Sequence, residues 1–504
     1  MTQGNSNLLE GDERHATLIN NANAIRAICS SVEGTLGPKG LDAMLVSPQG
    51  DVIITNDGVT ILEKMDVTHP AAKLLIQVAR SQQRVVGDGT TTATVLAGAL
   101  VQEGVAQVLR GVPASKVVTG MQQGIAWVKQ AIAQRAIRVT GIDDPLLRQT
   151  AFIAGREQQD IVDLVMEAAA RVGLERLLDP DYSLSESVFA HEKATSEVWH
   201  GLLLRQQPIY RHGAVERRHA RILVLQDALE PEQLDEELLT TEAGFGQYME
   251  HRARFMQQLE GLSRLDVALI VLERGIHPDA EQFCADHNMM VVQRVSREEI
   301  RRICNSTGAI PIKRAALHKP EEQLKQTLGY SEYVRYDERL ERVRVACESA
   351  VSIIIGASTA EVVGERARIA ADAASAVQTA VRGGILPGGG TTELAVSYEL
   401  ERFRESLRGM ESFGAAAVSA ALRKPMSQII QNAGFNPLEK VEQARAAQQE
   451  CGTDAMGIDC DTGAFIDYIQ QGIIDPANVK IHAIHAAGEV AAAILRIHTV
   501  IKMR

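Results

Sequence analysis

The residues Gly87-Asp88-Gly89-Thr90-Thr91-Thr92 combine one carboxylate and three hydroxyl groups with two glycines, directly before an apolar stretch. Apolar residues at helical spacing predict helices on both sides, over 69–86 and 93–109. The loop would then lie at a helix N-terminus, where free N–H groups and the helix dipole favour a phosphate. Asp88 offers a hard oxygen for a divalent cation. The loop therefore predicts a phosphate and magnesium site, although the same residues could serve only as a helix cap, and no Walker A Gly-Lys-Ser/Thr follows.

Turns that contain glycine occur at three further places next to predicted helix ends. Residues 34–40 end a predicted helix over 14–32, and Asn56-Asp57-Gly58 leads into another predicted helix. The third turn is the glycine run 388–390. Separate turns would each need a cause of their own, whereas a single phosphate site accounts for all of them.

Asp372 is an ionisable residue among small apolar ones, in the sequence Ala370-Ala371-Asp372-Ala373-Ala374. The surrounding pattern predicts a helix over 361–381. A carboxylate in such a setting is either exposed to solvent or functional.

Composition excludes several classes of protein. The chain has 504 residues, of which 45% are hydrophobic and 23% charged, so we expect two or three folded domains. A formal charge of −12 argues against a nucleic-acid partner. The sequence shows no secretion signal and no uninterrupted apolar span, so we expect a cytoplasmic protein with no membrane partner. Its six cysteines are scattered, which argues for reduced thiols rather than a metal site.

The two ends of the chain differ from its middle in the spacing of their apolar residues. The ends are predicted to be helical, with one hairpin of strands 43–46 and 52–55. In the middle, residues 200–350, short β-branched runs such as 221–225 and 267–272 alternate with helical patterns. The predicted fold is therefore a multidomain α protein with an α/β insertion.

The charged helical stretch 231–262 is longer than a usual crossover between two strands. Its apolar stripe indicates either a core helix or a projecting arm that buries the stripe against a partner. The pattern leaves these two alternatives open.

Six sequence strings, in order along the chain, resemble those of the chaperonins. They are TLGPKG (35–40), GDVIITNDGVTIL (50–62), HPAAKLL (69–75), GDGTTTATVLAG (87–98), GGG (388–390) and GIIDPANVK (472–480). The chain resembles the group II class, of the thermosome and CCT type, because of NDGVTIL, HPAAKLL and the extra helical stretch at 231–262.

Some features depart from the thermosome pattern. Leu386-Pro387 precedes the glycines where smaller residues are usual, Asp475 replaces a usual Glu, and no glycine–methionine tail is present. Asp372 stands sixteen positions before Gly388, one fewer than thermosomes lead us to expect. In these features the chain resembles the divergent bacterial branch of chaperonins called group III.

The resemblance implies an ATP and Mg²⁺ site with defined roles. Asp372 would be the general base, Asp57 would orient the attacking water, and Asp88 would bind the magnesium ion. Asp475 would take the ribose hydroxyls, and Arg156 would sense the γ-phosphate. The residues implied to contact the nucleotide are Leu36, Gly37, Pro38, Gly58, Gly87, Asp88, Gly89, Thr90, Thr91, Thr92, Arg156, Gly388, Gly389 and Asp475.

The resemblance also implies a chaperonin fold of three domains. The equatorial ATP-binding domain would comprise 1–137 and 387–504, and the intermediate hinge domain 138–199 and 351–386. The apical domain, 200–350, would bind clients and carry 231–262 as a helical lid protrusion.

The implied function is that of an ATP-dependent chaperone, an ATPase whose hydrolysis drives ring and lid closure around unfolded proteins. Its partners would be unfolded clients and further subunits in a double ring of eight per ring, without a separate lid co-chaperonin. One alternative is a chaperonin-derived scaffold without ATP turnover. Another is an unrelated metal-dependent phosphotransferase.

Overall fold

The computed structural model describes residues 6–210, 216–232 and 242–500, and these fall into two compact units. Unit 1 comprises Met1–Val162, Leu174–Ser185 and Ala371–Arg504. Unit 2 comprises Asp163–Gly173 and Glu186–Ala370. The division into three domains therefore stays a prediction, while the mixture of helical ends and an α/β middle is confirmed.

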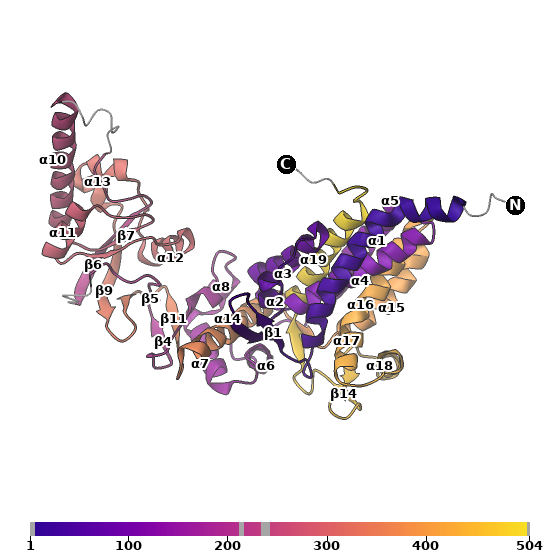
Figure 1. The fold of residues 1–504 in the computed structure, drawn as a ribbon. Helices are drawn as coiled ribbons and strands as arrows, with labels where there is room; N and C mark the ends of the chain where they lie inside the picture. Colours follow the sequence, from indigo (N-terminus) through magenta and orange to yellow (C-terminus); the bar gives the residue numbers. More distant parts are fainter. Residues whose placement is uncertain (1–5, 211–215, 233–241, 501–504) are drawn as a thin grey trace. The chain divides into compact units, whose positions relative to one another are not determined.

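Unit 1 is built mainly from long helices that lie along one another (Figure 1). Its helices are α1 (Ser6–Val32), η1 (Glu33–Thr35), α2 (Gly58–Lys64), α3 (Pro70–Val86), α4 (Thr90–Leu109), α5 (Ala114–Arg135), α6 (Pro145–Ala154), α8 (Leu174–Leu178), α15 (Thr391–Ser406), α16 (Glu411–Leu422), α17 (Lys424–Asn432), α18 (Pro437–Cys451) and α19 (Ala477–Leu495). Its strands pair as β1 (Ala43–Val46) with β2 (Val52–Thr55), β12 (Ile385–Pro387) with β15 (Ile474–Pro476), and β13 (Met456–Ile458) with β14 (Phe465–Asp467).

Helix α4 forms the centre of this unit. By length and composition alone it could span a membrane, but 67% of its apolar window is buried inside the protein. It packs against α1, α3, α16 and α19, and small residues permit the close approach. At Gly98, for example, a Cβ would come 2.3 Å from Sγ of Cys29. The apolar character of α4 is therefore that of a core helix.

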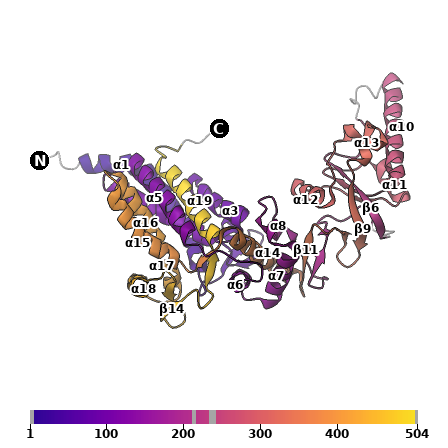
Figure 2. The same cartoon turned by 180° about the vertical axis from the view of Figure 1, so that it is seen from behind.

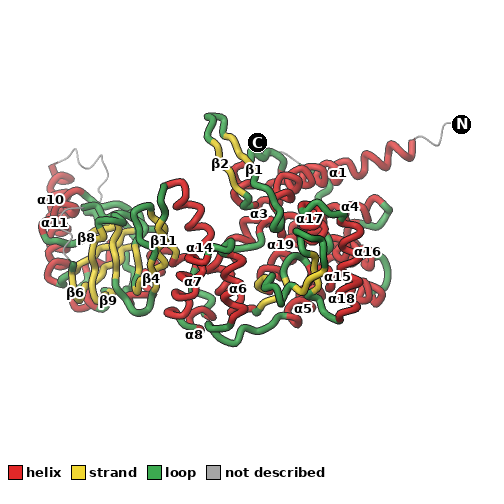
Figure 3. Tube along the Cα trace, turned by 90° about the horizontal axis from the view of Figure 1, so that it is seen from below, coloured by secondary structure: helices red, strands yellow, loops and turns green. Residues whose placement is uncertain are grey.

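The β1–β2 hairpin is the one expected from the sequence, and it extends away from the helices of unit 1 (Figure 3). Its apolar side chains are exposed. Met44 and Ile54 are cross-strand partners, and they are 64% and 61% exposed. Val46 and Val52 are also partners and are likewise exposed. A two-stranded sheet is marginally stable alone and leaves two edges unpaired.

Unit 2 contains a six-stranded sheet in the order β5-β10-β9-β6-β7-β8 and a three-stranded sheet in the order β3-β11-β4. The strands are β3 (Val188–His191), β4 (Glu197–His200), β5 (Leu202–Leu203), β6 (Arg217–Leu225), β7 (Val267–Leu272), β8 (Met290–Val292), β9 (Gly329–Asp337), β10 (Arg342–Val345) and β11 (Val351–Gly356). The helices are α10 (Glu242–Arg264), α11 (Pro278–Asp286), α12 (Arg297–Thr307), η3 (Arg314–His318) and α13 (Glu321–Lys325). Three further elements run across the boundary between the units: α7 (Gln159–Val172), η2 (Ser185–Ser187) and α14 (Ala360–Gly383).

Helices cover both faces of the large sheet (Figure 2). Strands β6, β7 and β8 are parallel, so α10 and α11 connect them as crossover helices and pack on the same face. Helix α12 packs on the other face through Ile300 and Ile303. Ser296 caps α12, but Glu299 does not return its side chain to Ser296 as in a full capping box. Its Oε1 instead accepts from the backbone N–H of Arg205, at 2.6 Å.

The stretch 231–262 combines both of the alternatives that the sequence left open. Residues 233–241, including Leu234 and Leu238, lie outside the described residues. The second half of α10 belongs to the core, where Phe255, Leu259 and Leu262 are buried. Near its start, Phe245 and Met249 are 58% and 46% exposed. Within α10, the exposed apolar side chains thus lie in its first half, and the lid role of 231–262 stays a prediction.

Candidate nucleotide site

The loop 87–92 connects two helices through two left-handed glycines. Gly87 ends α3 with φ of 73°, and Gly89 precedes α4 with φ of 76°, a region that side chains rarely adopt. Gly89 is the N-cap residue of α4, which has no side-chain cap. Oδ1 of Asp88 instead accepts from the N–H of Gly89, at 2.6 Å. The loop therefore does not cap α4 through a side chain, as the simpler alternative required.

A buried glutamine holds this loop in place. Nε2 of Gln82 donates to the carbonyl oxygens of Asp88, at 2.8 Å, and Val479, at 3.0 Å. Its Oε1 lies 2.8 Å from Nδ1 of His482. Gln82 thereby ties the loop to α19, a role that a single polar residue within an amphipathic helix does not reveal in the sequence.

The turn at Asn56-Asp57-Gly58 lies directly beside this loop. A Cβ at Gly58 would come 2.6 Å from Oγ1 of Thr91. Oδ2 of Asp57 caps α2 by accepting from the backbone N–H of Thr60, at 2.9 Å, and from its hydroxyl, at 2.6 Å. These bonds fix the carboxylate at the N-terminus of α2.

Arg156 reaches the same turn from the segment after α6. Its Nη2 donates to Oδ1 of Asn56, at 2.6 Å. Arg156 and Glu157 both have positive φ, at 50° and 60°, which is uncommon for residues other than glycine. The backbone at this position is therefore locally strained where the guanidinium approaches the turn.

The pKa of Asp88 shows that the charged residues gather around it. Burial raises this pKa above its usual value, and the nearby carboxylates of Asp475 and Asp57 raise it further. The N–H of Gly89 and the guanidinium of Arg156 act in the opposite direction. Bringing three carboxylates together in a partly buried place is costly unless a cation offsets them.

The donor set suits a magnesium ion that also binds phosphates. Among the described residues, no three His, Cys, Asp or Glu side chains form a complete metal cage. Magnesium at phosphate sites uses one or two carboxylates and takes its other ligands from phosphates and water. Asp88, on a helix N-terminus with an elevated pKa, fits this kind of site.

We expect Asp88→Asn to raise the thermal midpoint of the nucleotide-free protein at neutral pH. The folded protein binds a proton at Asp88 more tightly than the unfolded chain, so ionisation costs stability above this raised pKa. The gain should shrink as the pH falls through the raised pKa, which calorimetry over a pH series would show. The amide still accepts from Gly89. The exposed Asp66→Asn variant is the control, and a lower midpoint for Asp88→Asn would contradict the assignment.

The glycine run 388–390 lies against the strand that carries Asp475. Strands β12 and β15 pair Leu386 with Asp475, and the N–H of Gly388 donates to the carbonyl oxygen of Ile473, at 2.9 Å. A Cβ at Gly388 would approach Cγ of Asp475 to 3.4 Å. Gly389 has φ of 59°, and a Cβ there would come 2.6 Å from the ring of Tyr468. Two segments about ninety positions apart therefore form one surface.

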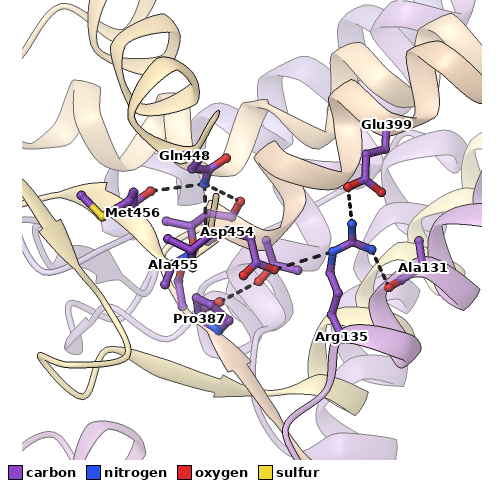
Figure 4. Close-up of polar contacts among 12 residues, drawn as sticks. Ala131, Arg135, Pro387, Glu399, Gln448, Asp454, Ala455 and Met456 are labelled. Carbon is purple, nitrogen blue, oxygen red and sulfur yellow. Dashed lines mark hydrogen bonds and ion pairs between the residues drawn. The ribbon is translucent and has the colours of Figure 1, made fainter. Parts of the chain in front are cut away.

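A polar network supports the helix that follows the glycine run (Figure 4). Nε2 of the buried Gln448 donates to the carbonyl oxygens of Thr391, at 3.1 Å, and of Asp454 and Met456, each at 3.2 Å. Arg135 donates to the carbonyl oxygen of Ala131 and pairs with Glu399 and Asp454. These contacts fix the start of α15.

Asp372 lies in the part of α14 that belongs to unit 1, and its side chain is half-buried. Ser375, one turn further along the helix, contacts the loop 87–92, because a Cβ at Gly87 would come 2.3 Å from Oγ of Ser375. This contact brings α14 to the loop and locates Asp372 about one turn, roughly 5 Å along the axis, from it.

The turn 34–40 has different neighbours. Asn432 donates from Nδ2 to the carbonyl oxygens of Glu33, at 2.9 Å, and Leu36, at 2.8 Å. Gly37 has φ of 86°, and a Cβ there would come 3.0 Å from the side chain of Ile429. The contacts that the structure describes for Leu36 and Gly37 are thus with α17, and not with the aspartates.

The chain is similar to known proteins over nearly its whole length. Residues 28–504 match the TCP-1/cpn60 chaperonin family. Thermosome subunit beta of Archaeoglobus fulgidus is 32% identical over 508 residues, with 95% of this chain and 91% of that protein covered. The thermosome subunit of Methanocaldococcus jannaschii is 29% identical over 489 residues, with 94% and 90% covered.

A solved structure is also similar. The crystal structure of a group III chaperonin in the open state superimposes with a TM-score of 0.80 and 44% identity, covering 97% of this chain and 100% of that one. This likeness agrees with the departures from the thermosome pattern noted in the sequence. The chain belongs to the TCP-1/cpn60 chaperonin family and is a chaperonin subunit.

Proposed function

We propose that this chaperonin subunit binds ATP with Mg²⁺ and hydrolyses it at the site around residues 87–92. Asp88 would bind the metal ion, and the N-terminus of α4 would hold the β- and γ-phosphates with Thr90, Thr91 and Thr92. When bound, the cation would neutralise charge on the transferred phosphoryl group.

The other residues of the site position the attacking water and the nucleotide. Asp57 orients the attacking water, Asp372 accepts its proton, and Arg156 senses the γ-phosphate. Asp475 and the glycine turn 388–390 hold the ribose. Gly37 and Pro38, in the turn 34–40, contact the phosphates and the sugar from one side of the nucleotide. Phosphoryl transfer depends more on such positioning and charge than on covalent chemistry.

One observation carries the proposal: the turn 56–58, Ser375 of α14 and Val479 all approach the loop 87–92, and Asp88 in this loop interacts with the charges of Asp57, Asp475 and Arg156. Four segments that are distant in sequence converge there at the N-terminus of a long helix. A purely structural role would favour dispersing these charges, because like charges held close together destabilise a fold.

Assembly into rings has support in the β1–β2 hairpin. Its exposed apolar residues and free strand edges are suited to pairing with another copy of the subunit. We propose a double ring with eight subunits per ring, a cytoplasmic location, and a built-in lid that makes a separate co-chaperonin unnecessary. A closed chamber would keep unfolded clients from associating through exposed apolar surface.

Turnover measured together with client refolding tests this function. The purified protein should release phosphate from MgATP and refold a denatured client only when ATP is present. Asp88→Ala should abolish both activities, and electron microscopy should show rings in wild type and variant alike. Rings that bind MgATP without turnover would identify the alternative, a scaffold protein without hydrolysis.

A further inference from the structure

Lys480 is a buried cation in contact with two carboxylates. Its side chain is 4% exposed, and its Nζ lies 3.0 and 2.9 Å from Oε1 and Oε2 of Glu393. The same Nζ lies 2.9 Å from Oδ2 of Asp475. A lysine this deeply buried is uncommon unless it is paired.

The side chains of Lys480, Glu393 and Asp475 differ in their exposure to solvent. Glu393 is buried, with a side chain 2% exposed, whereas the side chain of Asp475 is 35% exposed. Burial alone would lower the pKa of Lys480, but Asp475 and Glu393 outweigh it and hold this pKa above its usual value. The ammonium is therefore charged, fixed from the inside by Glu393 and directed towards Asp475.

The ion triad also joins two segments of the proposed site. Glu393 lies in the first turn of α15, directly after the glycine run 388–390. Lys480 lies in the first turn of α19, directly after the strand that carries Asp475. One ammonium group thus links the two segments to which the ribose is assigned.

We propose that Lys480 is a positioning residue that holds Oδ2 of Asp475, so that Oδ1 is oriented to accept from the ribose hydroxyls of the nucleotide. Glu393 anchors the ammonium by binding it through both carboxylate oxygens. The lysine also offsets part of the negative charge that Asp475 imposes on Asp88. This inference rests on the proposed nucleotide site and adds a source of selectivity for ribonucleotides.

The variants must avoid leaving a buried charge without a partner, which is strongly destabilising. Lys480→Met combined with Glu393→Gln removes both buried charges and keeps similar volumes. Glu393→Gln alone is the matched control, because Lys480 still reaches Asp475. Asp475→Asn removes the carboxylate itself, and circular dichroism and sedimentation confirm that each variant folds and assembles.

Binding is measured by calorimetry with MgATP and with 2′,3′-dideoxyATP, which lacks both ribose hydroxyls. A hydrogen bond to a charged group corresponds to a preference of about tenfold or more for ATP in the wild type. We expect the Lys480→Met/Glu393→Gln and Asp475→Asn variants to lose this preference. A variant that combines these three substitutions should lose no more than either of them. Glu393→Gln, whose amide oxygen can still accept from Lys480, should retain more of the preference than Lys480→Met/Glu393→Gln.

Two outcomes would overturn the inference, and they are distinguishable. If Asp475→Asn loses the preference while Lys480→Met/Glu393→Gln keeps it, the ribose assignment stands and Lys480 does not position Asp475. If Asp475→Asn keeps the full preference, the ribose assignment of Asp475 fails and the inference fails with it. A wild type that does not bind MgATP would contradict the proposed function itself.

Discussion

Asp372→Asn should bind MgATP with an affinity within a few fold of the wild type, yet hydrolyse it about 10²–10⁴ times more slowly. The helix that carries Asp372 contacts the loop 87–92 through Ser375, one turn away, so we expect this carboxylate to act on the attacking water rather than to bind the phosphates. Removing its basicity would leave the binding residues intact while taking away the acceptor for the proton of the attacking water.

Single-turnover phosphate release and equilibrium binding, measured on the same preparations, separate the two effects. The control is Glu365→Gln on the same helix, whose exposed side chain pairs with Arg368. That variant should turn over ATP at the wild-type rate. Turnover by Asp372→Asn at the wild-type rate would show that another group is the base.

Placing a charge pair on the β1–β2 hairpin should dissociate the ring. Met44→Lys with Ile54→Glu replaces two cross-strand partners, and the opposite charges keep the hairpin itself paired. The apolar side chains would otherwise be buried in the assembled ring, and full burial of each contributes about 1.5–3 kcal/mol. Losing both should weaken each subunit contact by at least about a hundredfold.

Sedimentation velocity with and without nucleotide measures this change. Gln49→Glu, in the turn of the same hairpin, adds a charge without touching the apolar side chains and should leave rings intact. We expect the double variant to sediment as a subunit that still binds MgATP. Intact rings in the double variant would exclude the hairpin from the subunit interface.

Local signals in the sequence predicted much of the fold. The hairpin, α3, α4 and α14 follow from periodicity and turn residues, and each lies within a few positions of its expected range. Strands β9 and β10 were not predicted, because charged residues such as Arg335 and Arg342 obscure the alternation of apolar and polar residues that identifies a strand. These two strands are instead stabilised by pairing within the folded sheet. The last helix ends at Leu495, although apolar residues continue beyond it.

The site was predictable where glycines and aspartates occur in short strings. Gln82, Glu393 and Lys480 were missed because each is one polar residue in a helix, and only the tertiary fold brings its partner close. The positions of Glu393 and Lys480 within otherwise apolar helix faces were the available signal. A charged residue at a core position requires a partner of opposite charge, and these two satisfy one another.

Helix α14 has a mechanical consequence. It runs without interruption for 24 residues from unit 2 into unit 1, which corresponds to about 36 Å. A helix of this kind resists bending, so it transmits rotation as a stiff lever. Its C-terminal end is followed by the buried Gly384, which adopts φ of 82° and leads into β12. Asp372 lies near the middle of α14, 11 residues or about 17 Å before its C-terminal end. A rotation of the helix about that end would therefore displace the carboxylate about half as far as it displaces the first residue of the helix.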